Sequence, residues 1–321
     1  GYSEEKVGRL AFELAQALCT AAIESTEFDL NNAVHRLREL NEDIRLGPST
    51  GAIVQAAVAR GIPFRRLTEG SLVQFGWGIK QRRIQASESD MTSAVAESIV
   101  QDKELTKILL HAAGIPVPLG RNVRSAEDAW IAAGEIGTTV VIKPQDSNQG
   151  KGVTVNLTDA EQVKSAFMIA SEFSSNVLVE RYLPGYDYRM LVVGNKLVAA
   201  ARRDPPQVTG DGKHNIRQLV EQINRDPMRG EGHVTSLTKI HLDEISLAHL
   251  AVQGLTADSI PAKGVRVILR NNANLSTGGT ATDVTDDVHP ELAARVVAAA
   301  QVVGLDICGI DVVCDNVMKS L

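Results

Sequence analysis

The sequence predicts an α+β fold in which a smaller α/β domain precedes a larger one. Segments with apolar residues at helical spacing alternate in mixed order with short runs rich in β-branched residues. The chain has 321 residues, a length that suits roughly two or three domains with their own cores. A polar break at residues 86–90 interrupts the apolar pattern. We therefore expect an N-terminal domain at residues 1–88 and a second domain at residues 89–321.

Helices open the expected N-terminal domain. Residues 4–24 carry apolar side chains on one helical face, and a second helix is expected at residues 30–41. A turn then leads to a helix that begins near Thr50 and ends at Gly61. Residues 71–87 have strand character with glycine breaks, which completes a small α/β arrangement.

The second domain begins with a helix and a strand–loop–strand unit. The pattern of residues 101–113 is helical and ends at Gly114, and a proline-containing extended piece follows. The two strands and their loop occupy residues 140–157, and a helix is expected at residues 159–173. Residues 176–206 read as three strands with a loop after the first.

The remainder of the chain is less regular at first. Residues 210–262 are polar and irregular, which leaves open a mobile flap or a poorly packed insertion. Residues 264–286 return to strand and loop, and residues 289–304 form a helix. A final buried strand is expected at residues 305–316.

Composition excludes several functional classes. The 33 basic and 39 acidic residues leave a net charge of −6, so we expect neither a nucleic-acid partner nor a membrane partner. Three cysteines without a C-x-x-C spacing argue against a disulfide framework or a zinc site and favour a cytoplasmic location. No apolar run approaches the roughly 20 residues of a membrane span.

The strand–loop–strand unit carries the first chemical signal. Its sequence, "VVIKPQDSNQGKGVTVNL", places Lys143 at the end of an apolar strand and two glycines in the loop. Glycines let backbone N–H groups approach phosphate oxygens, and an ammonium neutralises their charge. The loop lies between two strands, so it is neither a Walker loop nor a Rossmann fingerprint. A β-hairpin whose turn needs glycine is the alternative.

Other charged residues strengthen a nucleotide hypothesis. Lys103 opens a helix, so two lysines are expected to converge on one nucleotide. The segment "VERYLPGYDYRML" places Glu180 and Asp187 on either side of a short link after an apolar strand. Such a link offers backbone groups to adenine and carboxylates to ribose.

Each of these residues also has an ordinary structural explanation. Asp311 stands in the apolar run "GIDVV", where an unpaired carboxylate is costly, so we expect a cation or a donor beside it. Capping of a turn is the alternative for Asp311. A surface helix position is the alternative for Lys103, and a salt bridge within a strand is the alternative for Arg189.

Taken together and in order, these motifs resemble those of the ATP-grasp ligases. They are "DKELTK", "VVIKP…NQGKGV", "VERYLPGYDYRMLVVG", "NLSTGGTATDVTD" and "GIDVV". The longer stretch at residues 46–107 is similar to that of the cyanophycin synthetases in particular, whereas the later motifs are shared with glutathione-synthetase-type ligases.

The resemblance implies a fold, an activity and a set of partners. The larger domain would have the ATP-grasp fold, with a lid formed by residues 210–262, and would use ATP and Mg²⁺. It would phosphorylate the C-terminal carboxylate of a growing poly-aspartate backbone, and the amine of L-aspartate would attack the acyl phosphate. Cyanophycin or a poly-aspartate primer would be the acceptor. A Mur-ligase-like module of the full enzyme would add L-arginine, and the enzyme would form a homo-oligomer.

The resemblance also implies roles for individual residues. Arg189 and Gln149 would be catalytic, Ser49 and Arg189 would contact the acceptor or aspartate, and Asp311 would bind magnesium. The implied ATP-binding residues are Lys103, Lys143, Asn148, Gly150, Lys151, Gly152, Glu180, Tyr182, Leu183 and Asp187.

The sequence departs from the family pattern at two places, and both affect the expected activity. Position 149 is Gln where many relatives have His, which leaves hydrogen bonding but puts an acid–base role in doubt. The second metal-binding motif of the family, Glu-x-Asn, would follow the last strand, but the chain stops at Leu321. We therefore expect a C-terminally truncated ATP-grasp module that is inactive by itself. Another ATP-grasp peptide ligase and a non-catalytic polymer-binding module are the alternatives.

Overall fold

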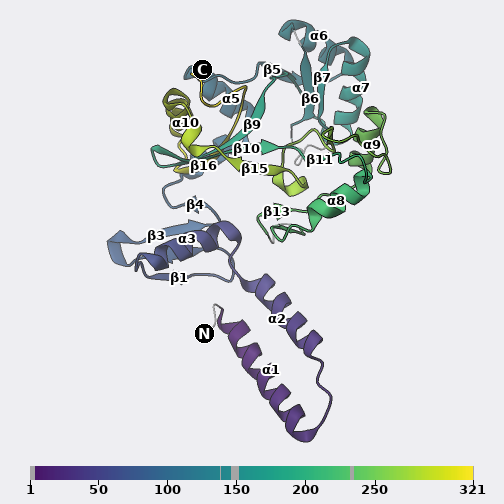
Figure 1. Cartoon of the computed structure of the whole chain (residues 1–321). Helices are drawn as coiled ribbons and strands as arrows, with labels where there is room; N and C mark the ends of the chain where they lie inside the picture. The colour runs from purple at the N-terminus through teal and green to yellow at the C-terminus, as the bar shows by residue number, and fades with distance from the viewer. Residues whose placement is uncertain (1–3, 138, 146–151, 232–234, 321) are drawn as a thin grey trace. The chain divides into compact units, whose positions relative to one another are not determined.

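The computed structural model separates the chain into two compact units (Figure 1). They are Gly1–Ser93 and Ala94–Leu321, so the division follows the sequence boundary expected after residue 88 by only a few positions. The described residues are 4–137, 139–145, 152–231 and 235–320.

A helical hairpin begins the first unit (Figure 1). It consists of α1 (Glu5–Glu24) and α2 (Leu30–Ile44), and α2 extends beyond its expected end at residue 41. Asp29 Oδ1 accepts a hydrogen bond from Asn32 N (2.9 Å). This bond satisfies one of the N–H groups that a helix leaves unpaired at its start.

A small antiparallel sheet completes the first unit. Its strands lie in the order β1-β2-β3-β4. Buried Val54, Val73 and Ile84 form its core. The elements after α2 are α3 (Pro48–Ala59), β1 (Phe64–Arg66), β2 (Val73–Phe75), the 3₁₀-helix η1 (Gly78–Lys80), β3 (Arg82–Gln85) and β4 (Glu88–Ser89).

Two short helices open the second unit. They are α4 (Ala94–Gln101), which we did not expect, and α5 (Lys103–Ala112). Asp102 separates them, and its Oδ1 accepts hydrogen bonds from Glu104 N and Leu105 N (3.0 Å each). A carboxylate is favourable at this position because it satisfies free N–H groups and faces the positive end of the helix dipole.

Two helices, α6 (Ala126–Ile136) and α7 (Ala160–Ser171), pack against one face of the first sheet of this unit. Its strands lie in the order β5-β8-β6-β7, and all neighbours are antiparallel. Val140, Ile142 and Val179 belong to the core that the two helices cover. The opposite face carries Lys143 and Glu180, because side chains alternate along a strand. The elements are β5 (Gly120–Val123), α6 (Ala126–Ile136), β6 (Val140–Pro144), β7 (Thr154–Leu157), α7 (Ala160–Ser171) and β8 (Val177–Arg181).

Helix α6 lies in a part of the chain for which the sequence analysis predicted no element. Its N-cap is Ser125, whose Oγ accepts a hydrogen bond from Asp128 N (3.1 Å). Its C-cap is Gly137, which has a φ of 69°, a backbone conformation that glycine adopts at little cost. Both end signals are present in the sequence, but the helix between them is rich in alanine and its apolar periodicity is weak.

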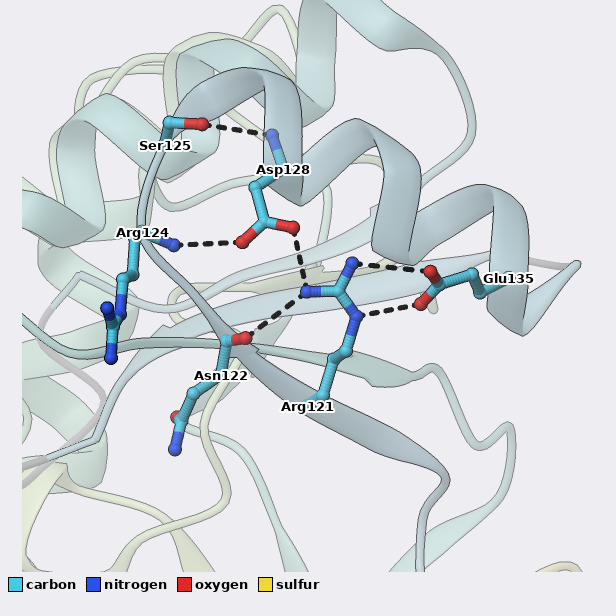
Figure 2. Close-up of polar contacts among 6 residues, drawn as sticks. All are labelled: Arg121, Asn122, Arg124, Ser125, Asp128 and Glu135. Carbon is cyan, nitrogen blue, oxygen red and sulfur yellow. Dashed lines mark hydrogen bonds and ion pairs between the residues drawn. The ribbon is translucent and has the colours of Figure 1, made fainter.

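Arg121 joins β5 to α6 (Figure 2). Its guanidinium donates to Asp128 Oδ1 (2.8 Å) and to Glu135 Oε2 (2.7 Å). Asp128 Oδ2 also accepts from the backbone N of Arg124 (3.2 Å). The hydrogen bond from Arg121 is the main reason that the pKa of Asp128 lies below its ordinary value.

The second sheet repeats this one-sided arrangement. Its strands lie in the order β15-β10-β9-β16, and all neighbours are antiparallel. Helix α10 covers one face, where Met190, Val192 and Val296 are buried. The elements are β9 (Tyr186–Val193), β10 (Lys196–Asp204), β15 (Thr280–Asp283), η3 (Thr285–Asp287), α10 (Pro290–Val303) and β16 (Ile307–Cys314). The expectation of a buried final strand is wrong, because β16 alternates half-buried and exposed side chains over its second half.

Residues 205–231 and 235–279 form a packed region with its own core, which corrects the expectation of irregular structure. Ile216, Leu250 and Val267 are buried in this core. Asn215 and Gln218 form a capping box at the start of its first helix. The elements are β11 (Gln207–Thr209), α8 (Ile216–Asn224), β12 (Arg229–Gly230), β13 (Leu237–Thr238), α9 (Glu244–Val252), β14 (Arg266–Ile268) and η2 (Leu275–Thr277).

Membrane spans were not expected from the sequence. Among the helices that the structure describes, none combines the length and the apolar character needed to cross a membrane.

We predict that Arg121→Gln destabilises the second unit modestly. Loss of two partly exposed ion pairs should lower the thermal midpoint by roughly 2–4 °C, which corresponds to about 1 kcal/mol in a unit of this size. Differential scanning calorimetry would measure the change. Arg124→Gln is the matched control, since the Arg124 side chain points away from Asp128 (Figure 2). An equal shift in both variants would contradict the role of Arg121.

Candidate active site

A cavity of about 530 Å³ lies within the second unit, against the uncovered face of the first sheet. Its walls come from that sheet, from α5, from the last turns of α10 and from β16. Four residues predicted from the sequence contribute to it, and they are Lys103, Lys143, Glu180 and Asp311. The fold therefore brings together groups that are far apart in the chain.

Lys103 is the first residue of α5 and reaches the end of β6. Its Nζ donates a hydrogen bond to the backbone O of Gln145 (2.7 Å). This bond joins the helix to the point where the glycine-containing loop begins. The predicted loop residues Asn148, Gln149, Gly150 and Lys151 lie outside the described residues.

Gly152, at the end of that loop, has no room for a side chain. A Cβ there would lie 2.7 Å from Phe173 Cδ2 and 2.8 Å from Pro144 Cγ. The residue also has a φ of 70°, which side chains disfavour. The glycine is therefore required by packing next to the strand that carries Lys143.

Glu180 is a buried carboxylate between two lysines. Its side chain is 7% exposed; Lys107 Nζ lies 2.6 Å from Oε1 and Lys143 Nζ lies 2.5 Å from Oε2. Burial alone would raise the pKa of Glu180, but the two ammonium groups outweigh it and hold the pKa below its ordinary value. Glu180 is therefore an ionised partner of the lysines, whereas the sequence suggested an acceptor for adenine or ribose.

Lys107 is a site residue that the sequence analysis missed. It lines the same cavity as Lys103 and stands four positions later in α5. Residues at this spacing share a helix face. The helical spacing within "DKELTK" was therefore a usable signal, although nothing in the sequence identified its partner Glu180.

A second group of charges lies on the uncovered face of the second sheet. Asp311 Oδ1 is 2.9 Å from Arg189 NH1 and 3.0 Å from Arg203 NH2. The strand register places Asp311 directly opposite Arg189. Asp311 thus has the donors that its sequence context called for, but its side chain is 55% exposed and not buried. Arg203 was not predicted.

Gly309 makes room for the Arg189 side chain. A Cβ at Gly309 would lie 2.3 Å from Arg189 Nε and 2.6 Å from its Cζ. These distances are far below any real contact, so the arginine crosses β16 where that strand lacks a side chain. The guanidinium can therefore reach Asp311 on the same strand.

Asp311 offers a partial set of magnesium ligands. Both arginines take Oδ1, and within the described part of the chain no donor is recorded on Oδ2. Magnesium keeps several waters and binds proteins through one or two carboxylates plus phosphate oxygens, so this oxygen fits the ion. The described residues contain no cluster of three or more His, Cys, Asp or Glu side chains that would hold a metal without phosphate.

Asp187 is a second carboxylate near Asp311 and Arg203, and burial has the largest effect on its pKa. Burial raises the pKa of Asp187, with a smaller contribution from Asp311, while Arg203 opposes both. In the strand register Asp187 stands opposite Arg203. The two carboxylates therefore share one face of the sheet.

The other predicted residues lie elsewhere. Tyr182 N donates to the backbone O of Thr139 (2.9 Å), and Leu183 is partly exposed. Neither is among the described residues that line the cavity. Ser49 is exposed in the first turn of α3, in the unit Gly1–Ser93.

Comparison with known proteins identifies similar chains. Residues 102–234 match the family model of the carbamoyl-phosphate synthase L chain, ATP binding domain. The chain is 42% identical to the cyanophycin synthetase of Trichormus variabilis over 100% of this chain and 36% of that protein. It is 34% identical to the glutathione biosynthesis bifunctional protein GshAB of Clostridium perfringens, over 86% of this chain and 36% of that protein. The chain thus spans little more than a third of the length of these relatives.

Solved structures include one that is similar to this chain in both fold and sequence. A bifunctional glutathione synthetase from Pasteurella multocida superposes with a TM-score of 0.64 and 32% identity, over 89% of this chain and 40% of that one. The expected fold class and the expected resemblance are confirmed by these comparisons.

Proposed function

We propose that this chain, which has the ATP-grasp fold and is similar to cyanophycin synthetases along its whole length, is the part of an ATP-dependent ligase that adds aspartate to a poly-aspartate backbone. One observation carries the proposal. Two lysines and a carboxylate with an available oxygen, Lys103, Lys143 and Asp311, line one cavity. Such a set suits the triphosphate of ATP and its metal ion.

The lysines would bind phosphate and the loop would cover it. Lys103 and Lys143 reach the cavity from a helix start and from a strand end, which are rigid supports. The loop at residues 148–152 would close over the phosphates and donate backbone N–H groups and the Gln149 amide. Tyr182 and Leu183, on the link after β8, would offer backbone groups to adenine, and Asp187 would bind ribose.

Asp311 would hold magnesium together with the phosphate oxygens. When bound, the ion would withdraw charge from the phosphate oxygens that face an incoming anion. Residues 210–262 would act as the lid that keeps water from the reaction, because an acyl phosphate is hydrolysed when water enters.

The arginines would bind the carboxylate that reacts. Arg189 presents a planar guanidinium on the uncovered face of the second sheet, and Arg203 lies beside it. Such a group pairs with a carboxylate through two parallel hydrogen bonds. Ser49, in the N-terminal unit, would contact the acceptor chain.

The reaction would proceed in two displacements. An oxygen of the acceptor's terminal carboxylate would attack the γ-phosphorus of ATP, the bond to ADP would break, and an acyl phosphate would form. The neutral amine of aspartate would then attack the acyl carbon, phosphate would leave, and the amine would lose a proton to solvent. The overall products are ADP, phosphate and an amide.

A second candidate is a glutathione-type ligation. The 34% identity to GshAB and the TM-score of 0.64 to a bifunctional glutathione synthetase favour it. Both reactions join an activated carboxylate to an amine. They differ in the acceptor and in the amino acid that is added.

The amino acid that stimulates phosphate release would test the proposal. In the full-length enzyme, which would include the Glu-x-Asn motif, we expect aspartate with a poly-aspartate primer to stimulate phosphate release from Mg·ATP, and glycine with γ-glutamylcysteine to have little effect. The opposite preference would support the glutathione-type reaction. Primer binding without any release would support a polymer-binding module.

We predict that Lys143→Ala weakens Mg·ATP binding about a hundredfold, since a phosphate contact in a closed site is worth roughly 3 kcal/mol. Isothermal titration calorimetry would measure the dissociation constant. Lys164→Ala is the matched control, because Lys164 pairs with Glu127 on the helix-covered side of the first sheet. A normal affinity in Lys143→Ala would remove Lys143 from the site.

We predict that Arg189→Lys raises the KM for primer or aspartate about tenfold, with a smaller change in the KM for ATP. An ammonium cannot make the paired hydrogen bonds of a guanidinium, a loss of roughly 1.4 kcal/mol. Initial rates of phosphate release by the full-length enzyme would give the KM values. Arg295→Lys, on the surface of α10, is the control. A change confined to ATP would show that Arg189 serves the nucleotide.

A further inference from the structure

Glu180 is shared by two lysines that have different places in the proposed site. Lys143 occupies Oε2 and Lys107 occupies Oε1, at 2.5 and 2.6 Å. Lys143 stands at a strand end beside the glycine loop, whereas Lys107 is one turn into α5. The carboxylate therefore connects Lys143 to a cation on a different element.

The charge of this group decides what it can bind. Lys143 and Glu180 alone would form a neutral pair, and a carboxylate that is 7% exposed would hold the single ammonium tightly because little water competes. With Lys107 present, two cations face one carboxylate, and the group has one net positive charge. The three residues line the cavity, so their net positive charge would attract an anion there.

Lys107 is held in place independently of the glycine loop. Helix α5 is fixed at its start by the Asp102 cap, and Thr106 Oγ1 donates to Ile99 O (2.7 Å). Glu104 Oε2 accepts from Asn122 Nδ2 of β5 (2.8 Å). These contacts place Lys107 next to Glu180 before any ligand arrives.

The space around Glu180 is also restricted on the strand next to it. A Cβ at Gly120 would lie 2.7 Å from Glu180 Cγ. The glycine at this position lets β5 and β8 pair while the carboxylate turns toward the lysines. The position of the Glu180 carboxylate is thus set by the sheet itself.

We propose that Lys107 is a positioning residue for nucleotide binding, which acts through Glu180 by neutralising the charge of its carboxylate so that Lys143 can bind phosphate. The inference rests on the function proposed above. It differs from a direct phosphate contact, because the effect of Lys107 requires the Glu180 charge. A purely structural role of Lys107 would change the stability of the fold, whereas the proposed role changes the affinity for the nucleotide.

A double-mutant cycle on the whole chain tests this inference. Calorimetry would measure the dissociation constant for Mg·ATP, and thermal unfolding would be recorded for every variant. We expect Lys107→Met to weaken binding about tenfold, a coupling within the usual range for groups in contact. Lys107→Arg, which keeps the charge, should restore most of the affinity. In a Glu180→Gln background, Lys107→Met should change the affinity less than about twofold.

Several outcomes would overturn the inference. A wild-type chain that does not bind Mg·ATP would overturn both the proposed function and this role. Normal binding by Lys107→Met would overturn this role alone. An equal loss in both backgrounds would make Lys107 a direct ligand. If Lys107→Met does not fold, Lys107→Gln keeps a donor without the charge, and the same weakening is expected; wild-type affinity in that variant would refute the inference.

Discussion

The one-sided covering of each sheet by helices is the constraint on which the rest of the second unit depends. Side chains alternate across a strand, so a sheet with helices on one face has a second face that they leave uncovered. Val140 and Met190 lie on the covered faces, where an unpaired charge would cost several kcal/mol. Lys143, Glu180 and Asp311 lie on the uncovered faces, and the cavity lies against one of these faces.

A carboxylate lies between two cations on each uncovered face, but the two groups differ in net charge. Glu180 lies between two lysines, and Asp311 lies between Arg189 and Arg203. Asp187, opposite Arg203, adds a second carboxylate to the arginine group. The excess positive charge, which suits a polyanionic substrate, therefore belongs to the lysine group. The two groups differ in their access to water, because the Glu180 side chain is 7% exposed and the Asp311 side chain is 55% exposed. Water therefore screens the arginine group more strongly than the lysine group.

The sequence predicts the elements with strong periodicity and the residues in recognisable motifs, and it fails where long-range pairing decides. The helices of the hairpin and the strand that carries Lys143 were expected within a few residues of their observed ends. Helix α6 was missed because its apolar pattern is weak. The core between β10 and β15 was missed although α8 has a strong apolar pattern, because the strands around α8 have only two or three residues each. Lys107 and Arg203 were missed for another reason. Their partners, Glu180 and Asp311, are reached only through sheet pairing, which a local pattern does not contain.

Position 309 accepts only glycine without displacing a neighbour, because the Arg189 side chain occupies the place of a Cβ. A Cβ at this position would lie 2.3 Å from Arg189 Nε, so any other residue would displace the guanidinium. Replacement by alanine, which strands elsewhere tolerate at small cost, would here act on the charged group of the neighbouring strand. In a survey of mutational tolerance along β16, Gly309 would therefore rank with the charged positions of the site, although it has no functional group of its own.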